Sequence, residues 1–261
     1  MLNAMKNPGE VRALCRSGTF DGETAGAALG HLQTNLVVLN KELAFEFLVF
    51  CQRNPKPCPL LDVTDPGSPD PKIIAPGADI RTDLPLYRVY RHGEMVEETA
   101  DILSYWRDDS VGFLIGCSFT FENALLAAGL KLRHHELGVG VPMYVTNIDC
   151  VPAGRFAGPM VVSMRPFSKK NAVHAVEVTG RYPGAHGAPV HIGDPREIGI
   201  TDLDRPDFGA PLPLREGEVP VFWACGVTPQ AVAMQVKPDL MSTHAPGHMF
   251  VADKRDAMLL H

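Results

Sequence analysis

The sequence predicts an α/β fold into which a smaller, β-rich α+β domain is inserted. Two stretches, 111–129 and 219–236, share one layout: an apolar run, a cysteine, a short polar turn and the start of an amphipathic helix. Between them, at about 131–210, short runs rich in Val, Met and Tyr alternate with Gly and Pro turns, which is typical of antiparallel sheets. We therefore expect an α/β domain at 1–130 plus 211–261 and an inserted domain at 131–210.

The first part of the chain predicts helices around one extended passage. Short helices are expected at 8–17 and 23–30, followed by an extended apolar segment at 31–40. Residues 41–53 have apolar side chains at helical spacing. This helix should stop at Asn54-Pro55, because proline disfavours helical backbone in the residue before it.

A long segment at 54–80 is rich in Pro, Gly and Asp, and only 60–63 is expected to be a strand. LPLYRVYRHGEMVEE then predicts two strands joined by a tight turn at His92-Gly93. ADILSYW, at 100–106, should start a helix. In the β-rich region, a helix is expected only at 168–175.

The two cysteine-containing turns are called here the first joint, Gly116–Asn123, and the second joint, Ala224–Gln230. At the first joint, Ser118 or Thr120 can cap the following helix. At the second joint, Thr228 is expected as the cap, with Pro229 as the first helical residue. Because a parallel-type pattern returns at 219, the strands that lead into the joints should pair or neighbour each other. Both helix starts should then open on one cleft, roofed by the inserted domain.

Composition excludes several classes of function. The net charge is -6 and no Lys/Arg-rich run occurs, so neither nucleic acid nor an anionic membrane is an expected partner. The longest apolar stretches, of about ten residues, are too short to span a bilayer. The first residues show no signal-peptide pattern, so we expect a cytoplasmic protein. No G-x-G-x-x-G follows a strand and no P-loop motif occurs, so neither nicotinamide nor nucleoside-triphosphate chemistry is supported, and no cofactor is expected. The G-x-S-x-G motif of serine hydrolases is also missing from the sequence.

The six cysteines include no C-x-x-C pair, and cytosolic thiols are normally reduced. Cys15, Cys51 and Cys150 are interpreted as small buried apolar residues. Cys117 and Cys225 are different, because each lies beside a helix N-terminus, where unpaired N–H groups and the helix dipole favour anions. A thiol in that position should have a lowered pKa and could serve in nucleophilic or acid/base work. The alternative is that the joints are two capped helices with no chemical role.

Other polar residues are weaker candidates. His244 and His248 lie in a Pro-Gly turn and could act as acid or base, although loop histidines with only structural bonds have the same pattern. The segment 181–195 contributes His186, His191 and Asp194 among glycines and prolines, a composition typical of ligand loops. Asn147 and Arg155 could line the same ligand cleft as this loop. His134-His135 are interpreted as solvated surface residues.

A family resemblance covers about residues 8–255. NPKPCPLLDVTDPG, DIRTDLPLYRVYRHG, GCSFTFENAL, TNIDCVPAGRFAGPMVVSMRP, RYPGAHGAPVHIGDPREIGI, PVFWACGVTPQ and THAPGHMFVAD together resemble the bacterial hydro-lyase family that is related to D-glutamate cyclase. The resemblance implies a three-layer α/β/α sandwich with a second α+β domain. It also implies a lyase that acts on carbon–oxygen bonds, with a relative that forms 5-oxo-D-proline from D-glutamate.

The resulting hypothesis is a cofactor-independent hydro-lyase that acts on a small carboxylate or amino acid. Dehydration needs a base and an acid that converge on the substrate. The candidate acid/base residues are Cys117, Cys225, Glu122, His244 and His248. The candidate substrate-binding residues are Ser118, Thr120, Asn123, Gly226, Thr228, Asn147, Arg155, His186, His191 and Asp194.

Three alternatives stay open at this point. Two cysteines that flank one α-carbon could make a racemase or epimerase, and the fold could also bind small carboxylates without catalysis. A metal lyase that uses His186, His191, Asp194, His244 and His248 is less favoured, because their spacings fit no standard site. The expected partner is a small-molecule carboxylate, and the sequence leaves open a homo-oligomer.

Overall fold

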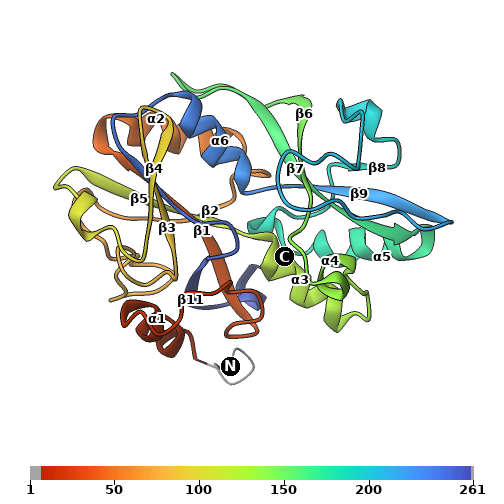
Figure 1. Cartoon of the computed structure of the whole chain (residues 1–261), viewed down its shortest axis with the longest axis horizontal. Helices are drawn as coiled ribbons and strands as arrows, with labels where there is room; N and C mark the ends of the chain where they lie inside the picture. The colour runs from red at the N-terminus through yellow and green to blue at the C-terminus, as the bar shows by residue number, and fades with distance from the viewer. Residues whose placement is uncertain (1–6, 260–261) are drawn as a thin grey trace.

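The computed structural model describes residues 7–259, which form a mixed α/β protein with two antiparallel sheets and six α-helices. The larger sheet has seven strands in the order β2-β5-β1-β10-β3-β4, with β11 also paired to β1. The smaller sheet has four strands in the order β6-β7-β9-β8. Figure 1 shows the two sheets side by side, with the C-terminal end of β9 in the four-stranded sheet leading toward the seven-stranded part.

The seven-stranded sheet is built on one long buried strand. Its strands are β1 (His31–Asn40), β2 (Leu60–Val63), β3 (Tyr87–Arg91), β4 (Glu94–Thr99), β5 (Ser110–Gly116), β10 (Met241–His244) and β11 (Phe250–Arg255). Side chains of β1 alternate between the two faces: Val37 packs with α2 (Lys41–Arg53) and α6 (Val227–Gln235). Leu36 packs on the other face against Ile74 and neighbouring residues of the long loop.

The four-stranded sheet has its own helical layer. Its strands are β6 (Met143–Asp149), β7 (Pro159–Ser168), β8 (His191–Ile192) and β9 (Glu218–Ala224). The helices α3 (Ser118–Ala127), α4 (Arg133–Leu137) and α5 (Lys169–Thr179) lie together on one side of this sheet (Figure 1). Phe121, Ala172 and Trp223 share the core between α3, α5 and β9.

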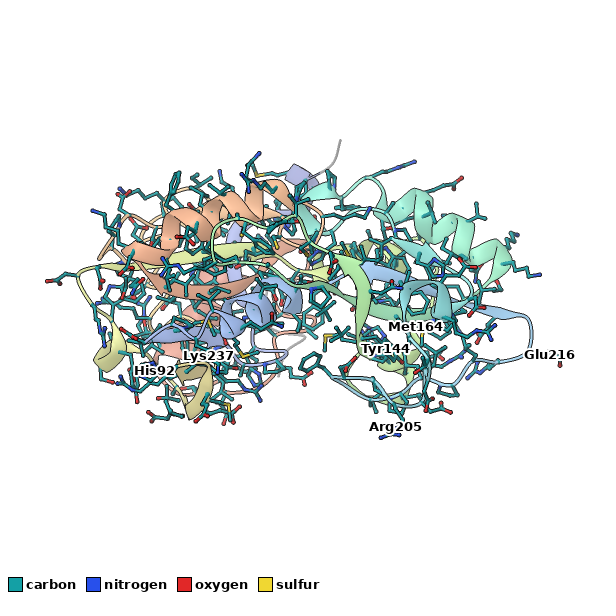
Figure 2. All side chains as sticks on the ribbon, turned by 90° about the horizontal axis from the view of Figure 1, so that it is seen from above. His92, Tyr144, Met164, Arg205, Glu216 and Lys237 are labelled. Atoms are coloured by element: carbon teal, nitrogen blue, oxygen red, sulfur yellow. The ribbon has the colours of Figure 1, made fainter. Side chains whose placement is uncertain are left out.

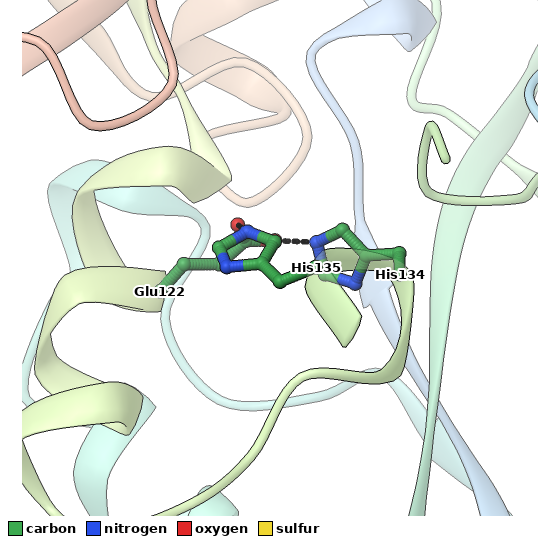
Figure 3. Close-up of side chains that lie close together, drawn as sticks. All are labelled: Glu122, His134 and His135. Carbon is green, nitrogen blue, oxygen red and sulfur yellow. Dashed lines mark hydrogen bonds and ion pairs between the residues drawn. The ribbon is translucent and has the colours of Figure 1, made fainter. Parts of the chain in front are cut away.

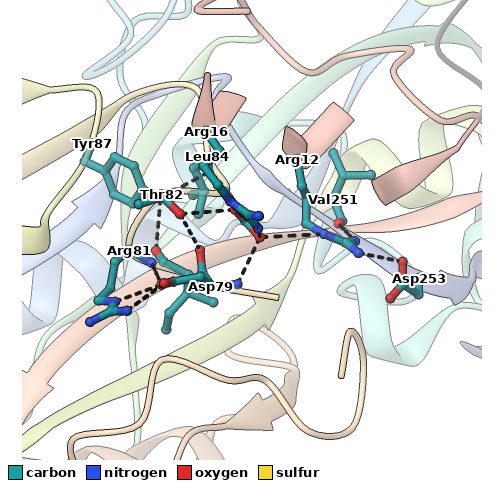
Figure 4. A network of polar contacts seen from close by, with 11 residues as sticks. Arg12, Arg16, Asp79, Arg81, Thr82, Leu84, Tyr87, Val251 and Asp253 are labelled. Atoms are coloured by element: carbon teal, nitrogen blue, oxygen red, sulfur yellow. Dashed lines mark hydrogen bonds and ion pairs between the residues drawn. The ribbon is translucent and has the colours of Figure 1, made fainter. Parts of the chain in front are cut away.

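The N-terminal helix α1 (Pro8–Arg16) is held by charged groups (Figure 4). Arg12 donates to the carbonyl of Val251 at 2.8 Å and to Asp253 at 2.9 Å. Arg16 donates to both oxygens of the buried Asp83. These bonds attach α1 to β11 and to the segment before β3, so the role of this network is to hold α1 in place.

Several predicted elements are confirmed: α1, β1, α2, β2 and the β3–β4 hairpin that turns at His92-Gly93. The helix expected at 23–30 is wrong, because those residues form turns before β1. The helix expected at 100–106 is only a short 3₁₀ turn. The four short 3₁₀ elements of the described chain are η2 (Leu103–Tyr105), η3 (Pro183–Ala185), η4 (Pro195–Ile198) and η5 (Asp256–Leu259).

The expectation that the two joint strands pair or neighbour each other is wrong. β5 pairs antiparallel with β1, whereas β9 forms a continuous antiparallel ladder with β7, from Val162–Ala224 to Ser168–Glu218. β9 therefore belongs to the four-stranded sheet, which extends past residue 210. The mixed α/β class is confirmed, but every strand pairing is antiparallel.

Figure 2 shows how the side chains fill these two parts: His92 and Lys237 lie with the seven-stranded sheet, and Tyr144 and Met164 with the four-stranded one. All six cysteines are buried and free. Among residues 7–259, the helices are all too short or too polar to cross a membrane.

Candidate active site

The first joint connects a fully buried strand to α3. The side-chain amide of Asn35, on β1, donates to the carbonyl of Gly116 at 2.9 Å and so fixes the end of β5. Cys117 occupies the N-cap position, without a capping bond from its side chain. The prediction that Ser118 or Thr120 caps α3 is wrong, because the helix already begins at Ser118. The Ser118 hydroxyl instead accepts from Arg165 at 3.1 Å.

The second joint has the same plan. Gly226 is the N-cap of α6, which begins at Val227. The prediction of Thr228 as cap and Pro229 as first helical residue is therefore wrong. The Thr228 hydroxyl accepts from the N–H of Val161 at 3.0 Å and donates to its carbonyl at 3.1 Å, so it ties α6 to β7.

Asn35 brings the two joints together. A β-carbon added at Gly226 would lie 2.1 Å from the Asn35 amide nitrogen, so the backbone of the second joint rests directly on this side chain. The same amide binds Gly116 of the first joint. The two joints, which are about a hundred residues apart in the chain, thus meet at one residue of β1.

Both thiols lie among the free N–H groups at these helix starts, yet neither has a lowered pKa. Burial raises the pKa of Cys117 to about 12, and the nearby Cys225 adds to the rise, while the N–H of Phe119 and the charge of Arg165 oppose it. Burial also raises the pKa of Cys225, against the N–H groups of Val227 and Gly226 and against Arg165. The expectation of reactive thiolates is wrong, because desolvation outweighs the helix effect. Both groups are thiols at neutral pH, 7% and 9% exposed.

A buried ion pair lies beside the first joint. Arg165, on β7, is fully buried and donates through Nε to Oε1 of Glu122 at 2.9 Å, and through Nη2 to the same oxygen. Its Nη1 donates to Ser163 at 3.0 Å. The guanidinium lies over two neighbouring rings, at 5.1 Å from the centroid of Phe121 and 5.5 Å from that of Trp223.

Two histidines of α4 complete this cluster (Figure 3). Nε2 of His135 donates to Oε2 of Glu122 at 3.1 Å, and Nε2 of His134 lies 3.2 Å from Oε1. Burial alone would raise the pKa of Glu122, but Arg165 and the two histidines hold it well below its usual value. The prediction that His134-His135 form a solvated surface is wrong for His134, which is 4% exposed. The sequence signal for this cluster was a glutamate in the first turns of a helix whose other residues are uncharged.

The loop 181–195 packs against Gly116 of the first joint. A β-carbon at Gly116 would lie 1.9 Å from the Gly184 carbonyl oxygen, so this loop packs on the end of β5. His186 is buried, and its Nδ1 donates to the carbonyl of Lys56 at 2.9 Å. Burial lowers the pKa of His186 to about 4, so its ring is neutral at pH 7.

His244 is connected to the second joint, but His248 is not. Nδ1 of His244 accepts from the N–H of Leu36 at 3.1 Å and from the Gln230 amide of α6 at 2.9 Å. The ring nitrogens of His248 bind the carbonyls of Pro246 and Asp21, which holds the terminal loop.

The remaining candidates of the sequence analysis have other contacts. Thr120 accepts a long bond from the N–H of Gln33, and Asn123 is half-buried on α3. Arg155 pairs with Glu46 of α2 at the surface. His191 binds the carbonyl of Asp194, whose carboxylate pairs with Arg196, and Asn147 packs on Gly199. Within residues 7–259, none of the bonds of Asn147, Arg155, His191 or Asp194 involves a joint residue.

The burial of His244 predicts a pH dependence of stability. Burial lowers its pKa from 6.5 to about 4, with Arg88 and His248 adding to the effect, whereas the unfolded chain keeps the ordinary value. Between these values only the unfolded state is protonated, so the free energy of unfolding should fall as the pH falls from about 6.5 to about 4. A pKa shift of this size corresponds to a loss of about 3 kcal/mol in the free energy of unfolding.

Urea unfolding at pH 7, 5.5 and 4.5 measures this, with His244→Gln as the matched variant. The variant should lose part of the acid sensitivity, because glutamine does not titrate. Parallel pH profiles for the two proteins would rule out His244 as a source of it.

A cavity of about 640 Å³ lies elsewhere, lined by residues such as Arg16, Asp79 and Leu103 and by none of the joint residues. Because no joint residue lines this cavity, the cleft expected over both joints stays a prediction.

Comparisons with known proteins agree with one another. A family model described as D-glutamate cyclase matches residues 111–253, which include both joints and the Arg165 cluster. A protein of Stutzerimonas stutzeri, named "Putative hydro-lyase", is 64% identical over 97% of this chain and 96% of its own length. Similar proteins of Bacillus licheniformis (66%; 98% of this chain and 97% of its own) and Bacillus subtilis (63%; 97% and 98%) carry the same name with a gene label. A solved nitrogen repressor-like protein from Methanococcus jannaschii covers 90% of this chain and 91% of its own at 10% identity, with a TM-score of 0.38, too low to carry an argument.

Proposed function

This chain belongs to the D-glutamate cyclase family, and we propose that it is a hydro-lyase that removes water from a small carboxylate where α3 and α6 begin. The names of its relatives support the reaction class. For the substrate we propose D-glutamate, which would cyclise to 5-oxo-D-proline.

One observation carries this proposal: two helix N-termini meet at Asn35. The N–H of Phe119 faces one thiol, and those of Gly226 and Val227 face the other. Free N–H groups at helix starts bind carboxylates and stabilise developing oxyanions. Two such groups side by side suit a substrate with two carboxylates, one to be held and one to react.

The proposed reaction defines what the site must do. The amino nitrogen of D-glutamate forms a bond to the γ-carboxyl carbon, and one γ-oxygen leaves as water. Both protons of that water come from the ammonium group, so the protein moves protons from nitrogen to oxygen without gaining or losing any. A negative charge develops on the other γ-oxygen, and N–H donors that face this oxygen would stabilise it.

The protonated thiols of Cys117 and Cys225 fit the proton-donor part of this work. Burial keeps each proton on sulfur until a departing oxygen accepts it, and a proton from the substrate nitrogen then restores the thiol, so the overall transfer is still from nitrogen to oxygen. Glu122 is less suited to acid/base work than the sequence indicated, because Arg165 and two histidines stabilise its charged form. We assign it a positioning role, through Arg165 and Ser118.

The experiment is a proton NMR time course of the purified full chain with D-glutamate, and in parallel with L-glutamate. We expect 5-oxo-D-proline to appear in equal amount to the D-glutamate consumed, with little reaction of the L-isomer. No consumption of D-glutamate would rule out this substrate. Water loss from another small carboxylate in the same assay would retain the reaction class.

A second candidate function is a two-base racemase, which the contact of both cysteine-containing joints with Asn35 favours. Each thiol would serve one face of an α-carbon. In deuterium oxide, such an enzyme would exchange the α-hydrogen of its substrate for deuterium without any loss of water, whereas the cyclisation leaves that hydrogen in place.

We further propose that the four-stranded part is the inserted domain of an α/β sandwich. Its helical layer of α3, α4 and α5 and its separate core around Trp223 support this division.

A further inference from the structure

We propose that Glu122, His134 and His135 form a binding site for a divalent transition-metal ion of the Zn²⁺ type. The proposal is independent of the proposed reaction, because it rests on the donor atoms of these three residues alone. None of them is used as an acid or base in the reaction above.

The three donor atoms already converge. One ligand atom from each residue lies within 4.8 Å of the other two. Both Nε2 atoms face the Glu122 carboxylate, that of His134 at Oε1 and that of His135 at Oε2 (Figure 3). The two rings are 4.4 Å apart between centroids, so the two imidazoles lie next to each other.

A second, independent observation, on His134, indicates a ligand at this site. Its side chain is 5% exposed, and neither ring nitrogen has a hydrogen-bond partner of acceptable geometry. Leaving a buried polar group unpaired costs about 1–3 kcal/mol. A metal bound at Nε2 would satisfy that nitrogen.

Arg165 fits this site as the group that orients the carboxylate. It holds Oε1, while Oε2 is engaged by His135. Carboxylates that bind metals are commonly hydrogen-bonded in this way by a neighbouring donor. The positive guanidinium also repels a cation, so we expect micromolar affinity rather than the tighter binding of an isolated site.

The donor set selects the kind of metal. Two imidazoles and one carboxylate suit Zn²⁺ and related ions, whereas Ca²⁺ and Mg²⁺ prefer sites made of oxygen. Three protein ligands would leave a position open for water or another small ligand. The His135 side chain is 39% exposed, which provides a path for the ion to enter.

The experiment is a calorimetric titration of the full chain with Zn²⁺ after dialysis against chelator, with metal content measured by mass spectrometry. We expect one equivalent to bind, and His135→Ala and Glu122→Gln to weaken binding at least about tenfold. His174→Ala is the matched control, because His174 is exposed on α5, outside the cluster, and should bind like the unaltered protein.

His135→Ala is the decisive variant, since its side chain is partly exposed and its loss should leave the fold intact, which circular dichroism checks. Absence of Zn²⁺ binding, or equal binding by His135→Ala and the unaltered protein, would overturn the proposal. Either result would show that the cluster is a buried ion-pair network only, and the D-glutamate assay would be unaffected by that outcome.

Discussion

Replacement of Arg165 by methionine is expected to lower the free energy of unfolding by about 3–5 kcal/mol. Arg165 is fully buried, and it is the main positive charge beside Glu122, which is 2% exposed. Methionine fills similar space but leaves the carboxylate without its guanidinium and two serine hydroxyls without their donor. A large loss follows because a buried, uncompensated charge remains, not because the pair itself is worth that much.

Urea unfolding at pH 7 measures this loss, with three comparison variants: Arg155→Met, Glu122→Gln and the double variant Arg165→Met/Glu122→Gln. Arg155→Met removes an exposed ion pair to Glu46 and should cost only about 0–1 kcal/mol. The double variant Arg165→Met/Glu122→Gln removes both charges and should recover part of the stability of the single variant. If the double variant were as unstable as the sum of both single losses, the coupling between the two side chains would be disproved.

Replacement of Cys117 or Cys225 by serine is expected to lower kcat by about 10²–10⁴-fold in each case, the usual contribution of a positioned acid or base. Serine has nearly the same shape, so binding and folding should change little. Its hydroxyl is a much weaker acid than a thiol, so proton transfer to the departing oxygen should slow. The measurement is the rate of 5-oxo-D-proline formation at saturating D-glutamate.

Cys15→Ser is the matched control for these variants. Cys15 is also buried and its pKa is also raised to about 12, but it lies on α1, outside both joints. It should retain the full rate. Full activity in both Cys117→Ser and Cys225→Ser would remove the thiols from the mechanism, whereas an equal loss in Cys15→Ser would indicate a general effect on folding.

Elements with strong local signals were predictable from the sequence. The helix α2 has apolar residues at helical spacing and a proline that follows it, and the β3–β4 hairpin has a His-Gly turn. The two joints were also recognisable, because a strand, a cysteine and a helix start are contiguous in the chain. These features depend on neighbouring residues, which a sequence displays directly.

Features made by distant residues were not predictable. Arg165 and Glu122 are 43 residues apart, and only the β7–β9 ladder and α3 packing place them together. His134 resembled a surface residue because its neighbours in the chain are charged, yet it turns toward Glu122. The raised pKa of Cys117 follows from burial by the whole fold, which no local motif encodes.

The central claim, that the meeting point of α3 and α6 binds the substrate, is tested most directly by a crystal structure of the protein soaked with D-glutamate or 5-oxo-D-proline. We expect the ligand to contact the N–H groups of Phe119 or Val227, beside Cys117 and Cys225. A ligand bound in the cavity near Arg16 and Leu103, with the joints unoccupied at saturating concentration, would contradict the claim.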